Sequence, residues 1–356
     1  MRIAIDAREL AGRPTGVGRY LAEILAAWSS LAGAATHQFV LCAPEAPAIS
    51  LPGLDIEIAV AHGRGTAWEQ LTLPRLLRQR RAGVLFAPGY SAPILTRIPT
   101  VVTIHDVSFA AHPEWFRARE GARRRTLTRL SARRAARVVT VSNFSKREIV
   151  RHLGIDQSKV EVIYSGATSI ARSAAREPLV LYVGSIFNRR HVPELIDGFA
   201  RLAAEHPEVR LEVVGDNRTY PHVDVPGLAA ASGAAGRIRV RSYIPDDELA
   251  TLYGRASAFA FLSDYEGFGM TPLDALGAGV PPVVLDTEVS REIYGPAALF
   301  VNRPDPAAVH HALQRALFDD GVRRRILESA PQQLERYSWR ECAHRTLQVL
   351  LACAAV

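Results

Sequence analysis

The chain of 356 residues has little cysteine and no long apolar run. Its three cysteines, Cys42, Cys342 and Cys353, show no metal-ligand spacing and cannot all pair, which fits a reducing compartment. No apolar stretch reaches the ~18 residues that a membrane-spanning helix needs. The first residues, MRIAIDAREL, place Asp6 where a signal peptide has its apolar core. We therefore expect a cytoplasmic protein without an export signal.

Lysine is also scarce, since Lys146 and Lys159 are the only two, although the formal net charge is +7. Arginine carries the positive charge, which favours anionic partners such as nucleotide sugars, anionic lipid or nucleic acid. Nine arginines lie between Arg117 and Arg137 without one aromatic residue. Nucleic-acid-binding segments interleave the two kinds of side chain, so we expect no nucleic acid. We interpret the segment as a solvated helix face, with peripheral contact to anionic lipid on the inner face of a membrane as the alternative.

Short apolar strands alternate with helices in two series, and the length suits two domains of about 150 to 180 residues. This alternation predicts parallel sheets flanked by helices. A small, polar stretch from Ser165 to Glu177 has the composition of a linker between the two series. The expected strands are 2–6, 37–42, 56–60, 84–87, 99–106, 138–141 and 160–164, followed by 179–183, 210–214, 237–241, 256–262 and 283–285.

Around Glu266 the sequence reads FAFLSDYEGFGMTPLDALGAGVPPVV, an apolar strand followed by a glycine-rich turn and a helix. Gly267 and Gly269 leave room for backbone amides to approach a ligand. We expect Thr271 to cap the helix that follows, so that its amino end can hold a phosphate. A loop carboxylate flanked by glycines is typical of a functional residue, which makes Glu266 the first candidate.

Asp274 has two possible roles. With Thr271 three residues before it, it fits a capping box that only satisfies backbone donors. It can also contact a ligand beside the phosphates. The sequence leaves both roles open.

Two further glycine-rich segments follow strands. Gly184 precedes Arg189 and Arg190 at the start of a helix, which suggests a second anion site. Near the amino end, Gly16 and Gly18 form a predicted loop before a helix, but the spacing departs from a dinucleotide fingerprint, so we expect no nicotinamide cofactor. A tight turn without a ligand is the alternative for these two glycines.

The strand predicted at 99–106 delivers His105 and Asp106 at its carboxyl end. Ligands of open α/β sheets bind at that edge, which makes His105 a candidate rather than a structural histidine. No Asp-x-Asp pair stands at a strand end as a metal clamp, so we expect neither a metal nor another cofactor.

The segment around Glu266 resembles the donor-binding motif of retaining glycosyltransferases of family 4, in which a Glu, seven further residues and a second Glu bracket an EGFG turn. Here the pair is Glu266 and Asp274, and the resemblance covers almost the whole chain. It implies the GT-B architecture, with two doubly wound Rossmann-like domains facing each other across a cleft. The acceptor-side domain would comprise residues 1–170 with a terminal helix at 339–356, and the donor-binding domain residues 171–338.

The resemblance also implies transfer of a sugar from a nucleotide diphosphate to a saccharide or lipid-linked acceptor, with retention of configuration. The chain looks most like bacterial mannosyltransferases of surface-polysaccharide assembly, which makes GDP-mannose the expected donor. An epimerase or a phosphorylase on the same plan is the alternative. The implied catalytic residues are Glu266, His105 and Arg190. The implied donor-binding residues are Gly16, Gly18, Ser185, Arg189, Arg190, Ile244, Glu266, Gly267, Phe268, Gly269 and Asp274.

Overall fold

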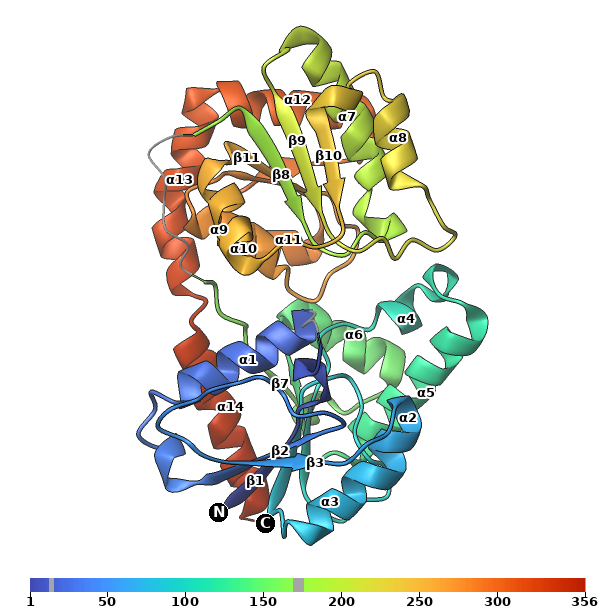
Figure 1. The fold of residues 1–356 in the computed structure, drawn as a ribbon, viewed down its shortest axis with the longest axis vertical. Helices are drawn as coiled ribbons and strands as arrows, with labels where there is room; N and C mark the ends of the chain where they lie inside the picture. Colours follow the sequence, from blue (N-terminus) through green and yellow to red (C-terminus); the bar gives the residue numbers. More distant parts are fainter. Residues whose placement is uncertain (13–15, 169–175, 356) are drawn as a thin grey trace. The chain divides into compact units, whose positions relative to one another are not determined.

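The computed structural model describes residues 1–12, 16–168 and 176–355. The chain divides into two compact units (Figure 1). Unit 1 comprises Met1–Gly166 with Tyr337–Val356, and unit 2 comprises Ala167–Arg336. Each unit is built on one parallel sheet, which confirms the predicted α/β class with two Rossmann-like units.

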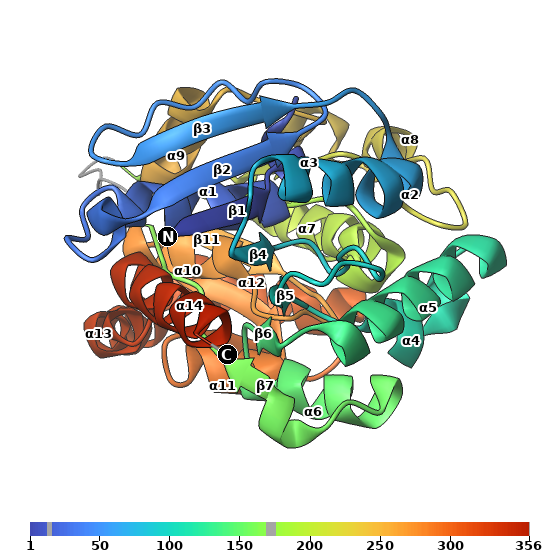
Figure 2. The ribbon, with the colours of Figure 1, turned by 90° about the horizontal axis from the view of Figure 1, so that it is seen from below.

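Unit 1 holds a seven-stranded parallel sheet in the order β3-β2-β1-β4-β5-β6-β7, which can be followed in Figure 2. Its strands are β1 (Arg2–Asp6), β2 (Gln38–Ala43), β3 (Asp55–Val60), β4 (Val84–Ala87), β5 (Thr100–Thr103), β6 (Arg137–Thr140) and β7 (Val160–Val162). Its longer helices are α1 (Gly16–Trp28), α3 (Leu73–Gln79), α5 (Ala118–Arg134), α6 (Asn143–Leu153) and α14 (Trp339–Ala354). Short helical turns are Arg8–Leu10, Ala34–Thr36, α2 (Gly65–Ala67), the π-helical turn Trp68–Thr72, α4 (Ser108–Ala111), Pro113–Trp115 and Gln157–Lys159.

The core of unit 1 includes helix α14, although this helix follows unit 2 in the sequence. Trp28 of α1 is fully buried, stacks on Phe39 with ring centroids 5.1 Å apart, and donates its indole N–H to the Ala343 carbonyl at 2.8 Å. Helix α14 also packs against β4 and β5. Burying each such aromatic side chain contributes about 1.5–3 kcal/mol, so α14 is an integral part of this core.

Unit 2 holds a six-stranded parallel sheet in the order β10-β9-β8-β11-β12-β13. Its strands are β8 (Leu179–Val183), β9 (Arg210–Val214), β10 (Ile238–Arg241), β11 (Ala258–Phe261), β12 (Pro282–Leu285) and β13 (Leu299–Val301). Its helices are α7 (Val192–Glu205), α8 (Val225–Ala231), α9 (Asp246–Arg255), α10 (Met270–Gly277), α11 (Glu288–Tyr294), α12 (Pro306–Phe318) and α13 (Asp320–Glu335), with short turns at Asn188–Arg190 and Ala235–Arg237.

The sequence predicts most strands within two residues, and β1, β4, β8 and β9 have the predicted bounds. Strand β5 ends at Thr103, so His105 and Asp106 follow the strand instead of ending it. The three-residue strand β13 was not predicted. The predicted linker at 165–177 includes residues 169–175, which lie outside the described residues.

In each sheet the strand order reverses once, between β1 and β4 in unit 1 and between β8 and β11 in unit 2. The loops that leave the carboxyl ends of two such neighbouring strands run to opposite sides of the sheet and open a crevice, which is where open α/β sheets bind ligands. We therefore expect the ligand-binding residues of each unit at its reversal point.

Candidate functional site

At the reversal point of unit 2, Arg190 and Glu266 form a two-point ion pair. Arg190 lies in the loop after β8, and Glu266 lies in the loop after β11, the neighbouring strand. Arg190 Nε donates to Glu266 Oε1 at 2.7 Å, and Nη2 donates to Oε2 at 3.0 Å. Both side chains are largely buried, with 13% and 16% exposed. The sequence singled out both residues, and the structure brings them together.

Neighbouring groups keep this pair charged. Burial opposes ionisation of Glu266, but Arg190, Arg189 and the Ser263 hydroxyl outweigh it and lower the pKa of the carboxyl. Burial likewise disfavours the charge on Arg190, but Glu266 raises the pKa of this guanidinium. Ser263 Oγ donates to Glu266 Oε1 at 2.8 Å. The guanidinium also lies 4.8 Å from the ring centre of Phe261, which limits its access to water.

Glycines at the ends of β8 and β9 allow close packing around Arg190. A Cβ on Gly184, where φ is +147°, would lie 2.9 Å from Arg190 Nη1. A Cβ on Gly215, where φ is +158°, would lie 1.9 Å from the Gly184 carbonyl oxygen. Ser185, a predicted donor-binding residue, contributes its backbone here, because Arg190 Nη1 donates to its carbonyl at 2.8 Å. The ends of β8 and β9 can approach this closely only without side chains.

The residues on either side of Arg190 also contact the loop after β11. Arg189 Nε donates to the Tyr265 carbonyl at 3.2 Å. His191 Nε2 donates to Asp264 Oδ2 at 2.7 Å, and Nδ1 lies 3.3 Å from Glu194 Oε1. Burial alone would lower the pKa of His191, but the two carboxylates raise it to about 9, so this histidine is cationic at neutral pH. The segment 189–191 is thus fastened to the loop that carries Glu266.

The glycine turn ahead of α10 differs from the prediction at its helix cap. The N-cap is Gly269, in a left-handed conformation with φ of +89°, and Thr271 is the second helical residue. A Cβ on Gly269 would lie 2.1 Å from the Tyr294 hydroxyl, which donates to the Gly269 carbonyl at 2.9 Å. The predicted Thr271 cap is therefore wrong, because the packing of Tyr294 selects a glycine at the turn. Gly267 and Phe268 lie in this turn, and Phe268 is buried.

Asp274 lies in the middle of α10 and is 1% exposed. Its Oδ1 accepts a hydrogen bond from the backbone N–H of Thr168 at 3.3 Å. Since Gly269 caps this helix without a side chain, the capping-box interpretation of Asp274 is wrong. Contact between Asp274 and a ligand stays a prediction. Ile244, another predicted donor-binding residue, is buried at 4% exposure in the loop after β10.

In unit 1, His105 follows β5 at the carboxyl edge of the sheet. Its Nε2 lies 2.8 Å from the Pro88 carbonyl oxygen, and its ring packs edge-on against Tyr20 at 4.8 Å. Burial lowers the pKa of His105, so the ring is neutral. Because a carbonyl only accepts, Nε2 carries the proton and Nδ1 has a free lone pair.

Asp106, next to His105, is a hydrogen-bond acceptor. It accepts a hydrogen bond from the Tyr90 hydroxyl at 2.9 Å and one from the Ser108 backbone at 2.8 Å. Tyr90 has a φ of +67°, a left-handed conformation that is uncommon for a bulky side chain and typical of functional loops.

The predicted glycine loop near the amino end is a helix in the structure. Gly16 is the first residue of α1 and Gly18 is buried in its first turn, while residues 13–15 lie outside the described residues. Both the loop and the tight-turn interpretations of these glycines are therefore wrong. A helix start remains compatible with an anion-binding role, which stays a prediction.

Sequence reasoning missed a charged cluster beside β1. Arg8 Nη2 lies 2.7 Å from Asp6 Oδ2 and 2.5 Å from Glu69 Oε2. Both carboxylates are buried, with 3% of each side chain exposed. In the sequence, this cluster is signalled only by Asp6 and Arg8, which stand two residues apart at the end of a predicted strand. Nothing in the local sequence around Glu69 indicates that it contacts Arg8, 61 residues earlier.

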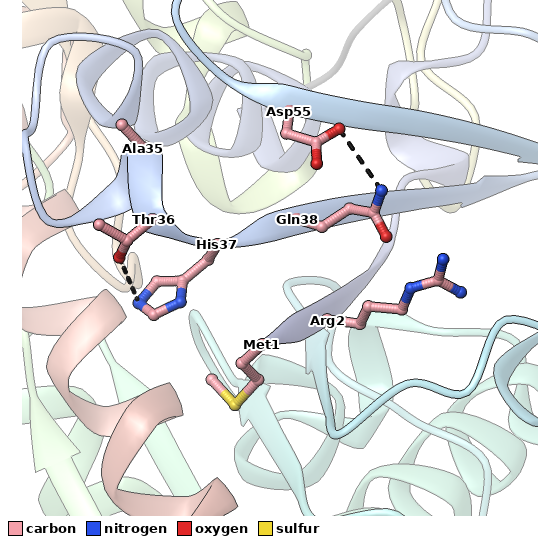
Figure 3. A pocket seen from close by; sticks show the side chains of 7 residues that line it. All are labelled: Met1, Arg2, Ala35, Thr36, His37, Gln38 and Asp55. Carbon is pink, nitrogen blue, oxygen red and sulfur yellow. Dashed lines mark hydrogen bonds between the residues drawn. The ribbon is translucent and has the colours of Figure 1, made fainter.

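A shallow pocket of about 330 Å³ lies elsewhere on unit 1. Figure 3 shows Arg2, Gln38 and Asp55 in its lining, which are the first residues of β1, β2 and β3. The pocket is thus at the amino edge of the sheet, opposite the edge where α/β ligands bind.

Comparison with protein families matches two models along the chain. The model described as Glycosyltransferase Family 4 matches residues 14–168. The model described as Glycosyl transferases group 1 matches residues 169–333.

Two relatives are O-antigen enzymes. The chain is 26% identical to O-antigen chain mannosyltransferase B of Escherichia coli, over 80% of this chain and 77% of the relative. It is 23% identical to O-antigen chain mannosyltransferase RfbU of Salmonella typhimurium, over 75% and 71% of the two chains.

Two solved structures have a similar fold. Sucrose-phosphate synthase from Thermosynechococcus elongatus has a TM-score of 0.80 at 17% identity, covering 100% of this chain and 99% of the other. Anabaena Alr3699/HepE in complex with UDP-glucose has a TM-score of 0.78 at 17% identity, covering 99% and 100%. At this level of identity the similarity concerns the fold alone.

Proposed function

Because the chain is a glycosyltransferase that belongs to group 1 and family 4, we propose that it transfers mannose from GDP-mannose to a hydroxyl of a saccharide or lipid-linked acceptor, with retention of configuration. The observation that carries this proposal is the Arg190–Glu266 pair at the reversal point of unit 2. Mannose is chosen because two relatives are O-antigen mannosyltransferases.

The hydrogen bonds of Arg190 leave it able to bind a diphosphate. A guanidinium has five N–H groups, and the described contacts use one on Nε, one on Nη1 and one on Nη2. At least one N–H therefore remains for an oxygen of the leaving diphosphate. With Arg189 beside it, Arg190 supplies the positive charge that stabilises the developing negative charge, in place of a metal ion or another cofactor.

Glu266 has acceptor capacity left for a sugar hydroxyl. Its Oε1 accepts from Arg190 Nε and Ser263 Oγ, whereas Oε2 accepts only from Arg190 Nη2 among the described residues. A carboxylate oxygen has two lone pairs, so Oε2 can take one more hydrogen. We assign Glu266 to this contact and to electrostatic stabilisation of the positive charge that develops on the sugar ring.

For His105 we propose a hydrogen bond from a donor-sugar hydroxyl to Nδ1. The proton on Nε2 is committed to the Pro88 carbonyl, which fixes both the tautomer and the plane of the ring. The lowered pKa keeps Nδ1 unprotonated near neutral pH. His105 thus positions a hydroxyl and does not act as an acid.

We further propose that helix α5 contacts anionic lipid near the acceptor. Its buried face consists of Gly121, Thr128, Ser131 and Ala132, while its arginines are exposed. The exposed arginines of this helix are Arg119, Arg123, Arg124, Arg125, Arg129, Arg133 and Arg134. No helix in the described part of the chain is long and apolar enough to cross a bilayer.

A ligand panel tests the donor. GDP, UDP and ADP are added separately to the full chain, and the melting temperature is measured with GDP-mannose turnover alongside. A ligand at one hundred times its Kd adds about 2.7 kcal/mol to the free energy of unfolding. We expect GDP to raise the melting temperature most. A larger shift with UDP or ADP would contradict the GDP-mannose assignment, and no shift with any of the three would contradict nucleotide-sugar chemistry.

A further inference from the structure

The reversal point of unit 1 holds the buried cluster of Asp6, Arg8 and Glu69. Asp6 ends β1, Arg8 opens the turn that follows, and Glu69 lies in the π-helical turn 68–72. Turns of this rare type are frequent at functional sites. Arg8 Nε donates to Asp6 Oδ1 at 3.1 Å, and Nη2 contacts both carboxylates. This arrangement fixes the guanidinium on one side.

The other side of Arg8 is available to a ligand. Its side chain is 19% exposed, against 3% for each carboxylate. Nη1 makes no hydrogen bond to any residue within 1–12, 16–168 and 176–355. An arginine whose Nε and Nη2 are locked while Nη1 stays open is pre-organised for binding, since little side-chain entropy is lost when a ligand arrives.

Two further residues, one from the loop after β4 and one from the π-helical turn, hydrogen-bond to Glu69. Ser91, after β4, donates to Glu69 Oε2 at 2.7 Å, and Gln70 Nε2 donates to Glu69 Oε1 at 2.6 Å. Ser91 follows Tyr90, the left-handed residue that holds Asp106. Through the adjacent residues Tyr90 and Ser91, the loop after β4 therefore contacts both the Arg8 cluster and the loop that carries His105.

The charge of the cluster indicates the kind of ligand. Burial raises the pKa of Asp6 despite the opposing charge of Arg8. With Asp6 ionised, one guanidinium faces two carboxylates and the net charge is negative. With Asp6 protonated, the cluster is neutral. In neither state is it positive, so it does not suit a phosphate.

We infer that Arg8, held by Asp6 and Glu69, binds a hydroxyl of a neutral saccharide and so helps to select the acceptor. Asp6 and Glu69 are positioning residues, because they act through Arg8. This inference rests on the proposed glycosyl transfer. A phosphate group of an acceptor is the competing ligand, and the experiment below distinguishes the two.

Trp68 provides a local reporter, because Arg8 Cζ lies 5.7 Å from its ring centre and its indole N–H donates to the Ala61 carbonyl at 2.6 Å. The chain has only four tryptophans, so ¹⁵N-tryptophan labelling gives four indole signals, and Trp68→Phe identifies this one. The full-length protein is titrated with methyl glycosides of neutral hexoses, and separately with inorganic phosphate. We expect a saturable shift of the Trp68 signal with at least one glycoside and none with phosphate.

Arg8→Lys tests the residue itself. Lysine keeps the positive charge that faces the two carboxylates, but one ammonium cannot reach both and still offer a fixed N–H to a ligand. We expect glycoside binding to weaken by about tenfold or more while GDP binding is unchanged. If Arg8→Lys does not fold, the double variant Arg8→Met with Glu69→Gln replaces it in the same titration, because it removes one charge of each sign. We expect the same loss of glycoside binding. Arg97→Lys, at an exposed position ahead of β5, is the matched control.

Three results would overturn the inference. The first is a Trp68 signal that responds to no glycoside, the second a response to phosphate instead, and the third an unchanged response in Arg8→Lys. Failure of the proposed function is separately visible, because GDP would then not bind and GDP-mannose would not be consumed, whatever the Trp68 signal does.

Discussion

Replacing Glu266 with glutamine is the sharpest test of the proposed chemistry. The amide keeps an oxygen that can accept from Arg190 Nε and Ser263 Oγ, but its NH₂ group then faces Arg190 Nη2, 3.0 Å from the replaced oxygen. One hydrogen bond is lost, two donors face each other, and the negative charge disappears. Losing an electrostatic contact to the transition state costs about 2.7–4 kcal/mol, so we expect kcat to fall about a hundredfold to a thousandfold.

Stability and nucleotide binding should move differently in this variant. Arg190, with 13% of its side chain exposed, loses its charge partner, so we expect the free energy of unfolding to fall by about 1–3 kcal/mol. Its charge is then free for a diphosphate, so GDP should bind as tightly as in the wild type or more tightly, and should restore part of the lost stability. The assays are single-turnover transfer, GDP titration calorimetry and thermal melting.

The controls separate charge from structure. Ser263→Ala removes only one hydrogen bond to Glu266 and should cost far less in rate. Glu328→Gln, on the exposed surface of α13, should change neither rate nor stability. Near-normal turnover in Glu266→Gln would refute the assigned role. GDP affinity that falls in parallel with kcat would show instead that the variant had damaged the donor site as a whole.

Three further predictions concern other residues. Because the pKa of His191 is raised from about 6.5 to about 9, its stabilisation is fully present below pH 6.5 and is lost as pH rises through 9. Chemical denaturation should therefore show up to about 3 kcal/mol of pH-dependent stability that His191→Asn lacks, and identical pH profiles of the two proteins would contradict this. Binding of the protein to liposomes should strengthen with anionic lipid content and weaken with salt, and each arginine of α5 changed to glutamine should weaken the binding free energy by about 1 kcal/mol. Equal binding to neutral vesicles would leave α5 as a solvated face. Asp274→Asn keeps the oxygen that accepts from Thr168, so melting temperature should change little while GDP affinity falls about tenfold; unchanged GDP affinity would exclude contact with the nucleotide.

The sequence was sufficient where a function or an element depends on local pattern. Apolar runs bounded by polar residues located β1, β8 and β9, and a carboxylate flanked by glycine located Glu266 in the loop after β11. The alternation of strands and helices predicted parallel sheets because a parallel connection requires a crossover.

Contacts between distant residues could not be predicted in this way. Arg190 and Glu266 are 76 residues apart and meet because β8 and β11 are neighbours in the sheet. Thr271 fits every local preference for a cap, but Tyr294, 25 residues after Gly269, imposes the glycine instead. Glu69 looks like an ordinary helix-surface residue until the fold places it against Arg8.

The placement of α14 in the core of unit 1 has a consequence for synthesis on the ribosome. Trp28 can form its hydrogen bond to Ala343 only after the whole of unit 2 has been translated, since residues 167–336 lie between the two partners. Because translation proceeds at about 5–20 residues per second, α1, β4 and β5 stay without their packing partner α14 for roughly ten to thirty seconds or more. Unit 2, whose segments are continuous in the sequence, can finish folding first. The apolar surface of unit 1, which is synthesised first, is therefore exposed the longest. Until α14 has been synthesised, the nascent chain depends most on protection from aggregation.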